Sequence, residues 1–86
     1  MYFYVYLICT KNNDNRLISY VGYTNNIKNR IKKHNSSKGA KFTRGKNWKL
    51  LFKKKFLTKS EAMKYEYMLK KDKMKRTILK KRFNNV

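Results

Sequence analysis

The segment from Tyr20 to His34 carries side chains whose types and spacing suit chemistry on a phosphodiester. Tyr20 and Gly22 precede Thr24, and Arg30 and His34 follow, four residues apart. An arginine presents a planar fork that matches phosphate oxygens, and a histidine titrates near neutral pH. A glycine allows a backbone or a phosphate to come close, although Gly22 also suits a plain strand end. The segment therefore predicts part of a phosphate-binding site.

The Arg30 and His34 pair also has a structural interpretation. Ile27 and Ile31 define the buried side of a helix predicted over residues 26–34, and both polar side chains lie beside that apolar stripe. Arg30 could extend along the apolar surface to water. His34 could simply end the helix, where positive charge suits the helix dipole. Both interpretations stay open at the level of the sequence.

Acidic residues are so few that a candidate metal ligand follows by elimination. The chain has four: Asp14 falls in a predicted turn, Glu61 in a helix cap, Asp72 after a helix, and Glu66 in mid-helix. Glu66 is expected to face the sheet edge, where a lysine could pair with it for stability. Alternatively it binds Mg²⁺, or Mn²⁺, which favour oxygen ligands. One available carboxylate favours a single-metal site, because a two-metal site usually needs several.

Tyrosines supply the third part of the candidate site. Tyr6 and Tyr20 fall on strands that we expect to be antiparallel neighbours, so their phenols could lie close together. Most of the seven tyrosines are expected to serve packing. A role in hydrolysis requires the phenol pKa of about 10 to come down. A metal, an arginine and nearby lysines would each lower it.

The charge of the chain indicates a polyanionic partner. It carries 24 basic and 4 acidic side chains, a net charge of +20, which predicts binding to nucleic acid. Lysine and asparagine are also favoured by A+T-rich codons, so part of the excess could reflect genome composition. We assign the nucleic-acid-binding surface to the basic side chains of the loop over residues 35–47, together with Gly22 and Thr24. The loop residues are Lys38, Lys41, Arg44 and Lys46.

The predicted elements give an α+β fold of order β-β-α-β-α-α, with helices on a small, largely antiparallel three-stranded sheet. Strands are predicted over 2–10, 16–23 and 48–56, the last with Trp48 in the core. Thr24 or Asn25 is expected to cap the first helix. A capping box over 58–61 begins a second helix that runs to about residue 70. The last helix is predicted over 75–83, with Ile78, Leu79 and Phe83 on its inner side.

Length and composition limit the classes of protein that fit. Eighty-six residues predict one domain, residues 1–86, with a modest core. A lone cysteine, Cys9, excludes an internal disulfide and a cysteine-based zinc site. Together with the absence of an evident signal peptide, this favours a cytoplasmic location. No apolar run approaches the roughly 20 residues of a membrane span, and we expect no membrane association.

The chain resembles a GIY-YIG nuclease domain over most of its length, from Tyr4 to about Phe83. It is similar in particular to short, stand-alone bacterial members related to the N-terminal nuclease domain of UvrC. The two motifs correspond to residues 4–6 and 20–22, the segment 20–34 follows the family pattern, and residues 39–43 resemble a loop of the short members. Residues 60–66 resemble the metal-binding helix. Tyr4 stands where the first motif has glycine, which is a departure from the family.

The resemblance implies roles for the candidate residues. Glu66 would hold the single Mg²⁺, Tyr6 and Tyr20 would hold or deprotonate the attacking water, and Arg30 would stabilise the pentavalent phosphate. His34 would assist proton transfer or orient a tyrosine.

We therefore expect a Mg²⁺-dependent DNA endonuclease with broad or structure-based preference, serving DNA repair or recombination. Two alternatives stay open: a catalytically inactive nucleic-acid-binding module, and a nuclease subunit that needs a protein partner.

Overall fold

Three antiparallel strands form the centre of the fold in the computed structural model, which describes residues 1–36 and 45–85. They are β1 (Phe3–Lys11), β2 (Leu17–Thr24) and β3 (Lys49–Phe56), in the sheet order β2-β1-β3. The helices are α1 (Ile27–Asn35), α2 (Lys59–Lys71) and α3 (Lys73–Lys80), and a 3₁₀ turn over Lys81–Asn85 follows. The predicted α+β class and order of elements are confirmed.

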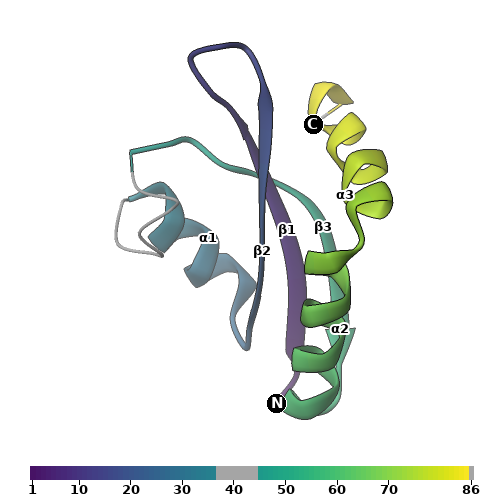
Figure 1. The fold of residues 1–86 in the computed structure, drawn as a ribbon. Coiled ribbons are helices and arrows are strands. Elements are labelled where there is room, and N and C mark those ends of the chain that lie inside the picture. The colour runs from purple at the N-terminus through teal and green to yellow at the C-terminus, as the bar shows by residue number, and fades with distance from the viewer. Residues whose placement is uncertain (37–44, 86) are drawn as a thin grey trace.

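The sheet is covered on both faces, which explains the alternating apolar pattern of β1. Helix α1 lies on one side of the sheet, and α2 and α3 lie on the other (Figure 1). Val5, Leu7 and Cys9 pack toward α2 and α3, in a cluster that includes Leu69 and Leu79. Tyr6 and Ile8 pack with Trp48 and the apolar side of α1. The predicted place of Trp48 in the core is confirmed, since it is 4% exposed.

A bulge adjusts the pairing of β1 with β3. Leu7 pairs with Phe52 and Ile8 with Leu50, so Leu51 is an extra residue on β3. Leu51 is buried and joins the cluster under α2 and α3. The bulge therefore lets Leu51 join Phe52 in the cluster under α2 and α3, while Leu50 packs with Ile8 in the cluster under α1.

Two details of the predicted helices are wrong. The side chain of Asn26, rather than Thr24 or Asn25, caps α1 by accepting a hydrogen bond from the backbone N–H of Asn29. The last helix begins at Lys73 because the Asp72 side chain caps it, and it ends at Lys80.

The inner side of α3 also differs from the prediction. Ile78 is 56% exposed, whereas Leu79 is buried and Phe83 packs against the same apolar cluster. Successive helical residues point about 100° apart, so burying the Leu79 face turns Ile78 outward.

The end of α1 is fastened to the start of β3 by one side chain. The Asn35 amide accepts a hydrogen bond from the backbone N–H of Trp48 at 2.6 Å and donates one to its carbonyl at 3.2 Å. This contact fixes the last turn of α1, which carries His34, against the sheet. Across residues 1–36 and 45–85, none of the helices has the length and apolar character to cross a bilayer.

Candidate active site

The site begins with a close approach between two strands. Tyr6 on β1 pairs with Gly22 on β2, and both belong to the face of the sheet that α1 covers. A Cβ atom at residue 22 would lie 2.5 Å from the Tyr6 hydroxyl oxygen and 2.8 Å from Cζ. The sequence suggested a backbone or phosphate near Gly22, but the group that occupies this space is the Tyr6 phenol. Glycine is therefore needed to let the phenol extend across β2.

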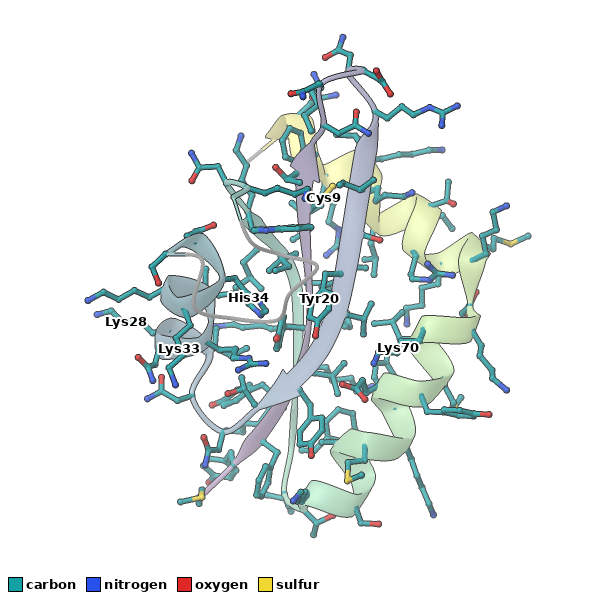
Figure 2. All side chains as sticks on the ribbon, turned by 60° about the vertical axis from the view of Figure 1, so that its left-hand side comes forward. Cys9, Tyr20, Lys28, Lys33, His34 and Lys70 are labelled. Atoms are coloured by element: carbon teal, nitrogen blue, oxygen red, sulfur yellow. The ribbon has the colours of Figure 1, made fainter. Side chains whose placement is uncertain are left out.

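The Tyr6 hydroxyl is held by two side chains of α1. It lies 2.8 Å from Nε2 of His34, and Nε of Arg30 donates a hydrogen bond to it at 3.4 Å. His34 is fully buried, and its ring lies edge-on to Tyr20 with centroids 5.2 Å apart. Tyr20 and His34 face each other in Figure 2. The four-residue spacing of Arg30 and His34 thus brings both to one phenol.

Burial and charge shift the pKa values of these groups. Desolvation raises the pKa of Tyr6 above its ordinary value of 10.0, although the nearby Arg30 guanidinium acts to lower it. The expected lowering of this phenol pKa is therefore wrong for Tyr6, because burial outweighs the cation. Burial, and next the charge of Arg30, lower the pKa of His34 below 6.5. His34 is therefore neutral at neutral pH and can accept the Tyr6 proton.

Helix α2 completes the site from the other side of β2. The α1 and α2 helices lie on either side of this edge strand (Figure 2). A cavity of about 440 Å³ there is lined by side chains from the sheet, α1, α2 and the turn after β2. They are Phe3, Tyr6, Tyr20, Gly22, Tyr23, Thr24, Asn25, Arg30, Lys59 and Glu66.

The cavity brings together most of the residues expected to act, and His34 lies behind it against Tyr6. Lys46 is half-buried ahead of β3 and does not line the cavity. Lys38, Lys41 and Arg44 lie outside the described residues. Their contacts with nucleic acid, like those of Gly22, Thr24 and Lys46, stay predictions.

Lys59 is a cavity residue that the sequence interpretation missed. It is the first residue of α2 and lines the cavity together with Glu66. The signal was present, because a separation of seven residues places two side chains on the same side of a helix. In a chain with 24 basic residues, that spacing alone could not distinguish Lys59 from other lysines.

Glu66 has the surroundings expected of a ligand for a hard cation. Its side chain is 19% exposed, shares the cavity with three tyrosines, and forms an ion pair with Lys70 through Oε1 at 3.7 Å. Lys70 is thus the lysine partner that the sequence allowed for. Glu66 also lines the cavity, as a metal ligand would have to. Among the described residues no three His, Cys, Asp or Glu side chains gather around one point. One carboxylate with several waters and a substrate phosphate fits Mg²⁺.

Comparison with known proteins identifies the family. The family described as the GIY-YIG catalytic domain matches residues 2–83. The chain belongs to the GIY-YIG family. Its catalytic domain is that of nucleases, so the cavity over β2 lies in a nuclease-type domain, and the predicted resemblance is confirmed.

Small bacterial GIY-YIG relatives match parts of the chain. UPF0213 protein OB0043 of Oceanobacillus iheyensis is 52% identical over 52 residues, which are 59% of this chain and 60% of that protein. RBAM_000440 of Bacillus velezensis is 49% identical over 70 residues, 80% of this chain and 65% of that protein. The matches thus span less than two thirds of the length of these two relatives. SH2523 of Staphylococcus haemolyticus is 46% identical over 68 residues, 78% of each chain.

A solution NMR structure of the UPF0213 protein BH0048 from Bacillus halodurans is also similar. It is 41% identical, with a TM-score of 0.49, over 92% of this chain and 82% of that one.

Proposed function

We propose that this GIY-YIG protein is a Mg²⁺-dependent endonuclease that hydrolyses phosphodiester bonds of DNA. The observation that carries the proposal is the meeting of Tyr6, Tyr20, Arg30 and Glu66 in one cavity at the β2 edge. These residues come from four elements, β1, β2, α1 and α2. Binding of nucleic acid alone would not require a half-buried carboxylate beside two phenols.

Each side chain has a distinct task in this reaction. Arg30 contacts the non-bridging phosphate oxygens and stabilises the charge that develops as water attacks. Tyr6 accepts a proton from the attacking water as its own hydroxyl proton passes to Nε2 of His34, 2.8 Å away. His34 suits this role because it is neutral and acts as a base. Tyr20 orients the water, and Glu66 holds the cation. A bound Mg²⁺ supplies further neutralisation of phosphate charge.

The Tyr6 hydroxyl, rather than that of Tyr20, is favoured as the proton carrier by its contacts. It accepts a hydrogen bond from Arg30 and has His34 Nε2 within donor distance. A phenol with a raised pKa stays protonated at neutral pH, so it can accept a proton only as it gives up its own, and the neighbouring histidine is what makes this transfer feasible. Basic side chains supply affinity that needs no base reading, which supports broad or structure-based preference.

The proposal is tested by plasmid nicking with and without Mg²⁺. We expect wild type to nick only with the cation, and Glu66→Gln to lose nicking while DNA binding persists. Mn²⁺ binding, measured by calorimetry, should weaken in Glu66→Gln. Arg30→Ala should cost about 100-fold or more in rate, as for removal of one preorganised donor.

Two controls match these variants. Glu61→Gln changes an exposed acid of the same helix, and Lys28→Ala an exposed base on α1. Nicking by Glu66→Gln at the wild-type rate would overturn the single-metal mechanism. Binding of DNA by wild type without cleavage under any of these conditions would favour the inactive binding module or a subunit that needs a partner.

A further inference from the structure

One side of α2 carries a cation on each side of the candidate metal ligand. Lys59, Met63, Glu66 and Lys70 are spaced by four, three and four residues, which is the spacing of one helical face. Lys59 precedes Glu66 by seven residues, or about 10.5 Å along the helix axis at the rise of an α-helix. Lys70 follows Glu66 by one turn.

The two lysines differ in what they contact. Lys70 is half-exposed, pairs with Glu66 at 3.7 Å, and does not line the cavity. Lys59 lines the cavity that holds Arg30 and Glu66. It also borders a second hollow of about 700 Å³ along α2, which Met63, Glu66 and Tyr67 help to form. Lys59 therefore lies, together with Glu66, at the boundary between the two hollows.

This position suits a phosphate other than the one being cleaved. Arg30 approaches the cavity from α1, and its Nε is directed at the Tyr6 hydroxyl. Lys59 lies about two helical turns away from Glu66, at the start of α2. A lysine is a compact charge on a flexible stem, which holds a phosphate without demanding one orientation. The N-terminal turn of α2 adds partial positive charge at the same place.

We propose that Lys59 binds a second phosphate of the same DNA strand, next to the scissile one, and so fixes the path of the strand through the site. This inference rests on the proposed function, because it assumes that the scissile phosphate lies between Arg30 and Glu66. Lys59 is a positioning residue: its loss raises KM more than it lowers kcat.

The first test measures binding in the absence of divalent cations, so that it does not depend on cleavage. The slope of log affinity against log salt changes by about 0.9 for each neutralised phosphate of duplex DNA and about 0.7 for single strands. We expect Lys59→Ala to have a shallower slope by about one such step. The matched control is Lys73→Ala, the exposed first residue of α3, which is likewise capped and lines neither hollow. Its slope should equal that of wild type.

The second test uses oligonucleotides in which one linkage is a neutral methylphosphonate. Neutralising the linkage beside the cut should slow wild-type cleavage, chiefly through KM. The same linkage should cause no further loss in Lys59→Ala, because the partner of that phosphate has already gone.

The outcomes separate this inference from the proposed function. If wild type cleaved no DNA, the proposed endonuclease function would be overturned. The salt dependence of binding would still test whether Lys59 contacts a phosphate. Equal slopes for wild type and Lys59→Ala, or equal changes in Lys59→Ala and Lys73→Ala, would overturn the inference. The inference would also be overturned if the losses of cleavage caused by Lys59→Ala and by the neutral linkage were additive wherever the linkage is placed.

Discussion

Tyr6 reaches the edge of the sheet because the residue paired with it has no side chain. Its phenol extends from the central strand across Gly22, so its hydroxyl can meet Arg30 and His34 of α1, and the buried side chain forms part of the cavity wall. Without that space, a central-strand residue could not present its hydroxyl at the outer edge of β2. The position of Tyr6, in the first motif, therefore requires a glycine at position 22, in the second motif.

Gly22→Ala should therefore displace the Tyr6 ring. The new methyl would lie 2.5 Å from the hydroxyl oxygen, and overpacking of this kind costs about 1–3 kcal/mol. We expect loss of that size in urea unfolding and a severe loss of cleavage. In a Tyr6→Phe background the same substitution should cost less stability, because the closest atom is gone. Equal costs in both backgrounds would show that the two residues are not coupled.

His34 makes stability depend on pH in a definite direction. Its pKa is lower in the folded protein than the ordinary value of 6.5, so the unfolded chain binds its proton first as pH falls. Stability should decline from about pH 6.5 downward until the folded pKa is passed. His34 is the sole histidine, so His34→Gln, which keeps a hydrogen-bonding group, should remove this decline between about pH 6.5 and 5. Urea unfolding of wild type and His34→Gln across that pH range measures this difference. Parallel curves of stability against pH would show that His34 is not the group responsible.

At the scale of elements, the first turn of α2 positions both Lys59 and Glu66. Thr58 caps it by accepting a hydrogen bond from the backbone N–H of Glu61 at 3.2 Å. The Glu61 carboxylate accepts a hydrogen bond from the Thr58 hydroxyl rather than from a backbone N–H, which differs from a full capping box.

Loss of this cap should lower stability. Thr58→Ala is expected to cost about 1 kcal/mol, or roughly 4–8 °C in Tm for a domain of this size. Ser60→Ala, in the same exposed turn, should change Tm by far less. A thermal melt of each variant measures the difference, and equal shifts would argue against the cap.

Local signals in the sequence were sufficient to predict the helices and strands. They were not sufficient to predict the contacts between those elements. Alternation along β1 and the cap at Thr58 depend on neighbouring residues, so the order of strands and helices could be predicted. The phenol over Gly22 depends on the pairing register of β1 with β2, which a sequence does not state. The direction of the Tyr6 pKa shift depends on how deeply the ring is buried, which the cations considered from the sequence do not reveal.

At the scale of the whole molecule, the net charge of +20 has little internal compensation. Within the part of the chain that the structure describes, the ion pair found is Glu66 with Lys70. Several lysines instead lie over aromatic rings, as Lys55 does over Tyr2 at 4.0 Å and Lys71 over Tyr67 at 4.3 Å. Such contacts hold the side chains without neutralising them, so the charge stays available to a polyanion.

DNA affinity should therefore fall steeply as salt rises. If six or more phosphates are neutralised, raising salt from about 50 to 200 mM should weaken binding by about 1,000-fold or more. Fluorescence anisotropy with a labelled duplex measures this. An affinity independent of salt would remove the electrostatic basis of the proposed interaction.

Strand β1 is enclosed by a strand on each side and a helical layer on each face. Residues 5–10 are buried without interruption. Amides in such a strand exchange with deuterium mainly through global unfolding, whereas edge strands and helix ends open locally. The Tyr6 amide is therefore expected to be among the slowest to exchange. The residue at the centre of the proposed chemistry would then keep its place until the molecule unfolds as a whole, and its exchange rate would report the free energy of unfolding.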